Sequence, residues 1–323
     1  MPTVSVIIPT YNRAFMLKEA IQSVLDQTYS DYEVIVVDDG STDNTREVVN
    51  ALSDKRVRYV FQENRERSAA RNHALSLARG RYIAFLDSDD LFLPTKLEKQ
   101  VAALEKEQKF GMVYSSAICT DKQGKRIAPF MYKATASGWI YRKVAFYVPI
   151  TILPTLVMIR TEVLSQVGGF DEKMTRFEDI DMWRRVARRY PILAMQEPLS
   201  IFRTHSDNEL ANQNPDKILR ALAYYVNKAF NEDKDESRIF LRRAAAKLYL
   251  RYGLAIFLSP EWHDSARTFI VHSIKYWPLQ IGAYFLLIAT YLNFPPFSIA
   301  IPLLARLRAA WLRWQNRIGG NKS

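Results

Sequence analysis

The first half of the chain alternates short apolar runs with segments in which apolar residues recur at helical spacing. Val4–Ile8 is a β-branched run typical of a buried strand, and the apolar residues between Leu17 and Leu25 repeat with the period of one helix face. The same alternation predicts strands at Val34–Val37, Val57–Phe61 and Tyr82–Leu86, and helices at Thr45–Leu52 and Ser68–Ala78. We therefore expect an α/β fold with a Rossmann-like, mainly parallel sheet and helices on both faces.

The second half of the chain is less regular and ends in helices. We expect strands at Met112–Ile118 and Leu156–Ile159, and a helix at Ile180–Arg189 that ends before Pro191. After the polar segment Ser206–Pro215 the pattern is helical, and Ser237–Leu258 and Trp262–Trp277 resemble an antiparallel helix pair. The chain therefore divides into an α/β domain at 1–205, a helical extension at 206–275 and a helical tail at 276–323.

Polar residues follow three of the predicted strands at the point where each strand ends. The clusters are Pro9-Thr10-Tyr11-Asn12, Asp38-Asp39-Gly40-Ser41 and Asp87-Ser88-Asp89-Asp90. Such residues also favour turns, but the carboxyl ends of parallel strands share one edge of a sheet, where ligands bind. We therefore expect the three clusters to converge at one site.

The carboxylates of the third cluster indicate a metal ion. Close-set carboxylates raise one another's pKa unless a cation or a hydrogen-bond donor holds them, and their oxygens suit Mg²⁺ or Mn²⁺. No G-x-x-x-x-G-K-[ST] occurs, and no G-x-G-x-x-G follows the first strand. A nucleotide at this edge would therefore be held by a metal ion and side chains rather than by a glycine-rich loop.

The composition restricts the class of protein. A chain of 323 residues with 48% hydrophobic residues can build a sizeable core, which argues against disorder. The single cysteine, Cys119, excludes an internal disulfide, and we expect it to be a buried, inert thiol. The net charge of +11 fits nucleic acid, or an anionic membrane and phosphorylated substrates. Since no zinc-finger spacing or RNP-like motif occurs, we expect no nucleic-acid partner.

The position of the positive charge favours a membrane surface. Tyr276–Ala305 has no charged residue, and the five basic residues of Arg306–Ser323 follow it without an acidic one. Asn293–Pro296 and Pro302 interrupt the apolar stretch, so we expect a re-entrant or interfacial hairpin rather than a single span; a dimerisation or packing segment is the alternative. The first apolar run begins at Val4, with no signal-like segment before it. We expect a peripheral or monotopic protein on the cytoplasmic face of the cell membrane.

Several motifs follow one another between Val4 and His205. They are VSVIIPTYNR at Val4–Arg13, VIVVDDGSTD at Val34–Asp43, SAARNHAL at Ser68–Leu75, GRYIAFLDSDD at Gly80–Asp90, GGFDE at Gly168–Glu172, FEDIDMWRR at Phe177–Arg185 and FRTH at Phe202–His205. In this order they resemble the family 2, GT-A fold, inverting glycosyltransferases, and among them bacterial enzymes of polysaccharide or lipid-linked oligosaccharide assembly. The resemblance implies that residues 1–205 are a GT-A catalytic domain that binds a nucleotide sugar.

The resemblance implies a nucleoside-diphosphate sugar donor, usually uridine-based, and a divalent cation, Mn²⁺ or Mg²⁺. Tyr11 would stack on the base, Asp39 would accept a hydrogen bond from the uracil N3–H, and Arg71 would lie near the nucleotide. Asp89 would bind the metal ion that bridges the phosphates, with Asp87 near the ribose or the metal ion, and His205 would complete the metal or diphosphate site. The remaining residues of the nucleotide-sugar site would be Pro9, Thr10, Arg13 and Ser88.

The same resemblance assigns the chemistry to Glu178 and Asp179. Asp179 matches the catalytic base, which would take the proton of the acceptor hydroxyl as its oxygen attacks the anomeric carbon, so that one displacement inverts the configuration. Asp181 lies about 200° around a helix from Asp179. We expect Asp181 to be an ordinary acidic residue in the first turn of a helix, where it favours the helix dipole. Trp183 either packs under the site or lines the acceptor groove, and we expect packing.

The mode of transfer and the acceptor follow from the same resemblance and from the tail. Processive relatives hold their polymer with a Q-x-x-R-W motif, which does not occur in this chain, so the addition of a single sugar is favoured. The acceptor would be a glycan or a polyprenyl-diphosphate-linked oligosaccharide. Two alternatives stay open: a nucleotidyltransferase, and an inactive nucleotide-binding protein that recruits partners to the membrane.

Overall fold

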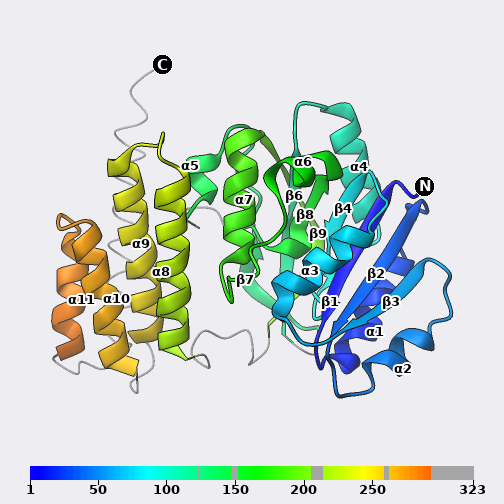
Figure 1. Cartoon of the computed structure of the whole chain (residues 1–323), viewed down its shortest axis with the longest axis horizontal. Coiled ribbons are helices and arrows are strands. Elements are labelled where there is room, and N and C mark those ends of the chain that lie inside the picture. Colours follow the sequence, from blue (N-terminus) through cyan, green and yellow to red (C-terminus); the bar gives the residue numbers. More distant parts are fainter. Residues whose placement is uncertain (122–123, 147–151, 205–213, 258–261, 292–323) are drawn as a thin grey trace. The chain divides into compact units, whose positions relative to one another are not determined.

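The computed structural model describes residues 1–121, 124–146, 152–204, 214–257 and 262–291. Strands and helices alternate as far as residue 203, and in the described chain helices alone follow (Figure 1). The strands are β1 (Val4–Thr10), β2 (Tyr32–Asp39), β3 (Val57–Gln62), β4 (Tyr82–Phe85), β5 (Leu91–Phe92), β6 (Met112–Thr120), β7 (Arg126–Tyr132), β8 (Val157–Arg160) and β9 (Ile192–Arg203). The helices are α1 (Ala14–Leu25), α2 (Thr45–Asn50), α3 (Glu66–Leu77), α4 (Lys96–Lys106), α5 (Tyr141–Val144), the 3-10 turn η1 (Pro154–Leu156), α6 (Thr161–Val167), α7 (Glu178–Arg189), α8 (Pro215–Glu232), α9 (Arg238–Phe257), α10 (His263–Tyr276) and α11 (Ile281–Tyr291).

One mixed sheet contains all nine strands of the described chain. Its order is β3-β2-β1-β4-β8-β6-β9-β5, and β7 pairs with β6 outside this path. Strands β1 to β4 are mutually parallel, and so are β6 and β9. The pairs β4-β8, β6-β8, β6-β7 and β5-β9 are antiparallel. The expected α/β fold is confirmed. The parallel strands β1 to β4 come from the part of the sequence in which strand-like and helix-like segments alternate regularly.

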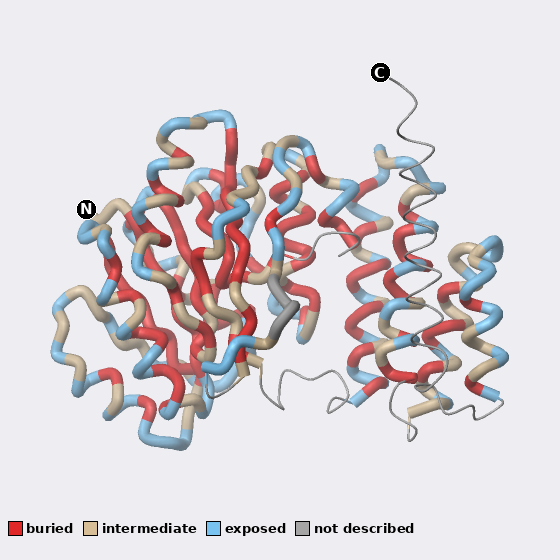
Figure 2. Tube along the Cα trace, turned by 180° about the vertical axis from the view of Figure 1, so that it is seen from behind, coloured by how far each residue is buried: buried red, intermediate tan, exposed pale blue. Residues whose placement is uncertain are grey.

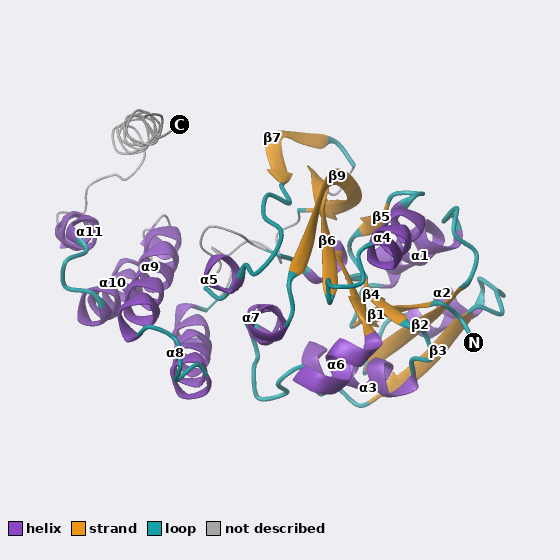
Figure 3. Ribbon diagram, turned by 90° about the horizontal axis from the view of Figure 1, so that it is seen from above, coloured by secondary structure: helices purple, strands orange, loops and turns teal. Residues whose placement is uncertain are grey.

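Helices cover both faces of the sheet, because successive strand residues point to opposite sides. On one face Ile7 and Phe85 pack against α3, α6 and α7. On the other face Val6 and Ala84 pack against α1, α2 and α4. Figure 3 shows the two groups of helices on either side of the strands, and Figure 2 shows β1 and β2 buried along their length. Burial on both faces explains why these strands are continuous apolar runs.

A buried polar cluster lies at the amino ends of β1 and β2. Ser5 Oγ donates a hydrogen bond to Glu33 at 2.7 Å and accepts one from the backbone N–H of Gly80 at 2.8 Å. Arg79 forms an ion pair with Glu33 at 2.7 Å. Gly80 leaves no room for a side chain, since a Cβ there would lie 2.7 Å from the carbonyl carbon of Val4. The close approach of the chain before β4 to β1 therefore requires glycine at this position.

The longest strand, β9, is one that the hydrophobic pattern does not predict. Its twelve residues, ILAMQEPLSIFR, include the exposed pair Gln196 and Glu197 and then Pro198, which cannot donate to a ladder. Pro198 pairs with Ser116 where the register of β6 and β9 shifts. The irregularity thus accommodates the proline, and pairing with β6 overrides the local sequence preference. The pattern also gave no prediction for β5, β7, α4, α5 or α6.

The described chain divides into two compact units. One takes in residues 1–204 and 220–234, and the other residues 214–219 and 235–291. The first unit therefore contains most of α8, which the sequence analysis placed in a separate helical extension. Lys228 of α8 forms ion pairs with Asp171 at 2.7 Å and with Asp181 at 3.0 Å, and these tie α8 to the sheet domain.

The second unit contains the predicted helix pair as α9 and α10. Ser273 donates to the carbonyl of Ala246 at 2.8 Å, and Tyr249 stacks on His272, so the two helices run antiparallel. α10 then packs against α11. In the part of the chain that the structure describes, no helix is long and apolar enough to cross a membrane. Of the tail expected at 276–323, residues 292–323 lie outside the described residues.

Candidate active site

The carboxyl ends of β1, β2 and β4 meet at one edge of the sheet, as expected for parallel neighbours. The register places Pro9 beside Val37 and Thr10 beside Asp38. The loops that follow β1 and β2 are joined by hydrogen bonds between Asn12 and residues of the other loop. Its backbone N–H donates to Ser41 at 2.9 Å, and its side-chain oxygen accepts from the N–H of Thr42 at 2.8 Å. The first two predicted clusters therefore converge.

Two of the predicted nucleotide-binding residues flank Asn12. Asn12 adopts a left-handed φ of 51°, which few residues other than glycine tolerate as well as asparagine does. Tyr11 precedes this turn and is 49% exposed. Arg13 follows it and precedes α1. The turn thus presents an aromatic ring at the edge of the sheet.

Asp39, at the end of β2, is buried and its Oδ1 is already bound. That oxygen accepts hydrogen bonds from Gln62 Nε2 at 2.7 Å and from the backbone N–H of Arg65 at 2.9 Å. The next residue, Gly40, has φ +84°, and a Cβ there would lie 2.9 Å from the Asn64 nitrogen. Asp39 is therefore held in place by β3 and the chain before α3.

Arg71 of α3 bridges two of the predicted groups. Its guanidinium is buried and forms ion pairs with Asp87 at 2.8 Å and with Glu178 at 2.9 Å. Burial alone would lower the pKa of Arg71, but the two carboxylates raise it, so the side chain stays charged. The acidic loop after β4 is thereby joined to the first turn of α7. The predicted role of Arg71 toward a nucleotide stays a prediction.

The carboxylates of the acidic loop after β4 lie in different environments. Asp90 is buried and accepts hydrogen bonds from Thr155 Oγ1 at 2.6 Å and from the backbone N–H of Arg203 at 3.1 Å. Burial, and then the nearby charges of Asp89 and Asp87, raise the pKa of Asp90 well above its usual value. Asp87 and Asp89 are half-buried. Asp90 therefore anchors the loop, and sequence reasoning missed its partners Thr155 and Arg203 because nothing local marks them.

These residues fit a divalent cation, which the sequence analysis assigned to Asp89 and His205. Asp87 and Asp89 offer half-buried carboxylate oxygens, the kind of ligand that a hard divalent cation prefers. No group of three or more His, Cys, Asp or Glu side chains that could hold a metal ion is formed by the described residues. Mg²⁺ commonly takes only one or two protein carboxylates. His205 lies outside the described residues.

The two predicted catalytic carboxylates open helix α7 in different environments. Glu178 is buried against Arg71; burial would raise its pKa, but Arg67 and Arg71 lower it below the usual value. Asp179 is half-buried and accepts a hydrogen bond from the N–H of Ile180 at 2.8 Å. Phe177, just before them, is buried with a left-handed φ of 68°, a strained conformation for a bulky residue. Strain of this kind is common at functional sites.

Asp181 and Trp183 are both buried and both contact neighbouring parts of the fold. Asp181 is fully buried and pairs with Arg184 at 2.8 Å, Arg185 at 2.9 Å and Lys228 at 3.0 Å. Trp183 is buried beside Phe85 and Phe170, with ring centroids 6.1 and 6.4 Å apart. Cys119 is also buried, and burial raises the pKa of its thiol.

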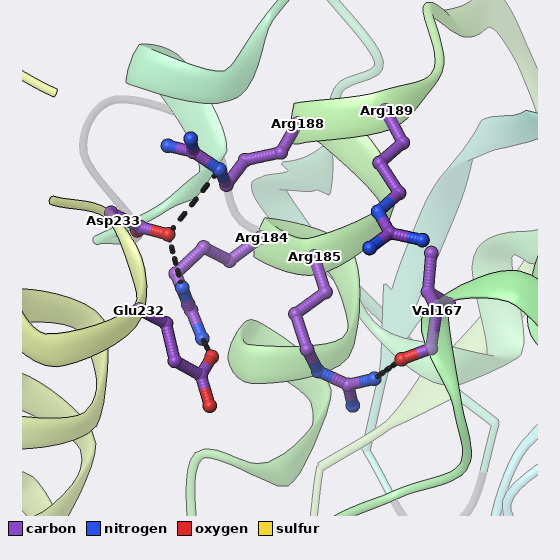
Figure 4. A pocket seen from close by; sticks show the side chains of 7 residues that line it. All are labelled: Val167, Arg184, Arg185, Arg188, Arg189, Glu232 and Asp233. Atoms are coloured by element: carbon purple, nitrogen blue, oxygen red, sulfur yellow. Dashed lines mark hydrogen bonds and ion pairs between the residues drawn. The ribbon is translucent and has the colours of Figure 1, made fainter. Parts of the chain in front are cut away.

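Charged residues join α7 to the end of α8 around a hollow. Arg184 pairs with Asp233 at 2.6 Å and also with Glu232, and Arg188 pairs with Asp233 at 3.4 Å. Figure 4 shows these side chains around a hollow of about 500 Å³, lined by Val167, Arg184, Arg185, Arg188, Arg189, Glu232 and Asp233. None of the predicted site residues lines it. The ion pairs fasten α8 to α7, and sequence reasoning missed them because they depend on the packing of two distant segments.

Comparison with known proteins identifies relatives of this chain. A sequence profile of the glycosyl transferase family 2 matches residues 5–167. An uncharacterised glycosyltransferase of Methanocaldococcus jannaschii is 32% identical over 72% of this chain and 81% of its own length. One of Rickettsia bellii is 36% identical over 70% of this chain and 33% of its own length. The chain spans about a third of the length of this protein and of its relatives from Rickettsia felis and Rickettsia conorii.

Solved structures show the same fold at low identity. S. aureus TarS 1-349, in complex with UDP, is 20% identical, with a TM-score of 0.62 over 90% of this chain and 89% of that one. The mannosyltransferase PcManGT of Pyrobaculum calidifontis, in complex with GDP-mannose and Mn²⁺, is 21% identical, with a TM-score of 0.59 over 99% of this chain and 88% of that one. Both likenesses confirm the GT-A fold expected from the sequence.

Proposed function

Because the chain belongs to glycosyl transferase family 2, we propose that it is an inverting, metal-dependent, non-processive glycosyltransferase. It moves a sugar from a nucleoside-diphosphate donor, which we assign as UDP, to a hydroxyl of a glycan or lipid-linked oligosaccharide. The observation that carries this proposal is the buried bridge from Asp87 through Arg71 to Glu178. It joins the segment assigned to the donor diphosphate to the segment assigned to the base.

The nucleotide is assigned to the edge formed by β1 and β2. Tyr11 offers an exposed ring on which a base stacks. Oδ1 of Asp39 is occupied by Gln62 and Arg65, and Oδ2 accepts the imino N–H of the base. Uracil and guanine both carry such an N–H, and the solved relatives were crystallised with UDP and with GDP-mannose. The donor screen described below therefore includes both nucleotides.

Asp89, with Asp87 beside it, is the residue assigned to the Mn²⁺ or Mg²⁺ ion, and His205 is the further candidate. The support is the set of oxygen ligands in the acidic loop and the Mn²⁺ in the P. calidifontis complex. When bound, the ion supplies Lewis-acid stabilisation of the charge on the leaving diphosphate. Thr155 and Arg203 hold the loop through Asp90.

Asp179 is assigned as the general base. It takes the proton of the acceptor hydroxyl while the new bond from that oxygen to the anomeric carbon forms and the bond to the donor diphosphate breaks. One displacement from the opposite side inverts the anomeric configuration. Glu178 is held by Arg71 in an ion pair that lowers its pKa, and it therefore positions the first turn of α7 rather than accepting a proton. General-base assistance contributes about 10²–10⁴ in rate.

The acceptor is assigned to the membrane, on the cytoplasmic face. The basis is the uncharged stretch Tyr276–Ala305 followed by five basic residues. A polyprenyl-diphosphate-linked oligosaccharide is an acceptor that a membrane-bound enzyme meets at high local concentration. Because this assignment rests on the tail, it does not depend on the identity of the donor.

The test is a donor screen with membrane lipid extract as acceptor. We expect release of UDP from a UDP-sugar in the presence of Mn²⁺ or Mg²⁺, loss of the reaction with EDTA, and recovery when metal is added back. Product stereochemistry, followed by NMR, should show inversion. Release of GDP from GDP-mannose, without release of UDP from any UDP-sugar, would contradict the assignment of UDP as the donor nucleotide.

Two outcomes would contradict the proposal. Consumption of a sugar phosphate and UTP with release of pyrophosphate would identify a nucleotidyltransferase. Binding of UDP without turnover on any acceptor fraction would identify an inactive nucleotide-binding protein.

A further inference from the structure

Helix α11 exposes five of its seven large apolar side chains, whereas its two buried residues are small or polar. The exposed residues are 42–71% accessible: Ile281, Tyr284, Phe285, Ile288 and Tyr291. Ala283 and Thr290 are instead fully buried, and Thr290 accepts a hydrogen bond from Arg267 at 3.2 Å. A helix that packs only against its own protein shows the opposite distribution.

The five exposed residues form one continuous stripe. They follow one another at spacings of three, one, three and three residues, which places them on one side of an α-helix. We call Ile281, Tyr284, Phe285, Ile288 and Tyr291 the α11 stripe. A contiguous apolar surface of this kind marks an interaction site rather than ordinary surface scatter.

Basic residues and aromatic rings lie at both ends of the stripe. The Arg243 guanidinium lies over the Trp277 ring, 5.3 Å from its centroid, shortly before α11 begins. The Arg267 guanidinium lies over the Tyr291 ring, 4.2 Å from its centroid, where α11 ends. Basic residues outnumber acidic ones by seven to three in residues 235–257 and 262–291, and residues 292–323 add five basic and no acidic residues. A partner that is both apolar and negatively charged fits these features.

We propose that the α11 stripe binds the surface of an anionic phospholipid bilayer, with α11 lying in the membrane plane. Its eleven residues span about 16 Å, about half the thickness of the hydrocarbon core, so the helix lies in the interface and does not cross it. The apolar side chains enter the boundary between headgroups and acyl chains, the aromatic rings occupy the interface, and the arginines contact lipid phosphates. This inference deepens the membrane assignment made above by naming the surface that binds lipid.

The experiment is co-sedimentation of the full-length chain with vesicles of equimolar phosphatidylglycerol and phosphatidylcholine. The double variant Phe285→Gln/Ile288→Gln should bind at least about ten-fold more weakly, because two large side chains no longer enter the apolar layer. Ile239→Gln is the matched control: Ile239 lies on α9 of the same unit, is 61% exposed, and should bind like the wild type. Binding of the wild type should also weaken on vesicles of phosphatidylcholine alone.

Hydrogen exchange of the unmodified chain tests the proposal without a substitution. Vesicles should protect residues 281–291 and leave the amino end of α9 unchanged. Wild-type vesicle binding by the double variant, or no protection of α11, would overturn the proposal. So would conversion of a dimer to a monomer by the double variant in sedimentation velocity, which would assign the stripe to a second copy. Neither measurement uses a sugar donor or an acceptor. A failure of the lipid-binding proposal can therefore be distinguished from a failure of the proposed transferase activity.

Discussion

Asp179 and Asp181 lie two residues apart in α7, and their surroundings assign them opposite tasks. Asp181 is fully enclosed by three basic side chains, which satisfy it and leave it no access to substrate. Asp179 is half-buried in the first turn, beside a Glu178 that Arg71 fixes. A carboxylate that must accept a proton needs the second kind of environment, with its neighbour held and itself within reach.

The first prediction separates these two aspartates. Asp179→Asn should lower kcat about 10²–10⁴-fold, because the amide cannot accept the proton, while the dissociation constant for UDP stays unchanged. Asp181→Asn should instead lower the free energy of unfolding, because Arg184, Arg185 and Lys228 lose a buried countercharge. Transfer kinetics, UDP titration and thermal melts measure the three quantities. Equal loss of activity in both variants, without a loss of stability in either, would contradict the assignment.

At the scale of single residues, the sequence indicated where polar groups gather but not how they are bound. Asp39, Asp87 and Asp89 follow strands, so the topology of a parallel sheet was enough to place them together. Arg71 has the appearance of a surface helix residue in the sequence, and only its burial between Asp87 and Glu178 shows that it holds the site together. The partners of Asp90 could not be predicted, because Thr155 and Arg203 are distant in sequence.

Among the elements, α8 has the least expected position. Residues 220–232 of this helix pack within the sheet-bearing unit, where Lys228 joins the segment that contains Asp171 to Asp181 of α7. Tyr225 donates a hydrogen bond to the carbonyl of Ala145, which adds a second attachment. The sheet-bearing unit therefore includes a helix that follows the last strand of the sheet.

The second prediction concerns this attachment. Lys228→Met should lower the free energy of unfolding by about 1–3 kcal/mol at neutral pH, because two largely buried carboxylates lose their shared cation. Lys228→Arg should restore much of the loss. Lys173→Met, on the same exposed loop as Asp171, is the matched control and should be close to neutral. Urea unfolding followed by circular dichroism measures all three variants.

The pH dependence of stability follows from the same contacts. Burial would raise the pKa of Asp171, but the hydrogen bond from Lys228 lowers it. Burial would also raise the pKa of Asp181, but the charges of Arg185 and Arg184 lower it. The folded protein thus binds these protons less tightly than the unfolded chain. Their contribution is present above the ordinary aspartate pKa, about 3.9, and is lost as pH falls through the lower folded values. Wild-type stability should fall in this range, and the fall should be shallower in Lys228→Met; identical slopes would contradict the role of Lys228.

The elements that sequence reasoning found are those with a local signal. Strands β1 to β4 are apolar runs separated by periodic helices, and all four were predicted together with their direction. β9 was missed because Gln196, Glu197 and Pro198 break its apolar run, and only pairing with β6 makes it a strand. The attachment of α8 to α7 was missed for the same reason, since it rests on ion pairs between residues nearly fifty positions apart.

For the molecule as a whole, the division into two compact units separates the two proposed sites. All the predicted site residues that the structure describes belong to the first unit, and the α11 stripe belongs to the second. The proposed chemistry on a nucleotide sugar and the proposed attachment to a lipid surface thus depend on different parts of the chain.

The third prediction tests this separation by calorimetry. A ligand stabilises only the unit that binds it, by about 2.7 kcal/mol at a concentration of one hundred times its dissociation constant. UDP with Mn²⁺ should therefore raise the melting temperature of one transition, and anionic vesicles should change only the other. A single transition that both ligands shift equally would show that the units unfold together and would contradict the prediction.

The tight approach at Gly80 has a practical consequence for work in cells. Even a methyl group at this position would collide with the backbone of Val4 and Ser5, so Gly80→Ala strains the sheet at the edge opposite to the predicted catalytic residues. Such a substitution leaves every residue that is predicted to bind the donor unaltered, but it lowers the thermal stability of the protein. It is therefore a suitable temperature-sensitive allele. In a growing culture, a small rise in temperature should remove the proposed transferase activity, and the acceptor that accumulates could then be isolated.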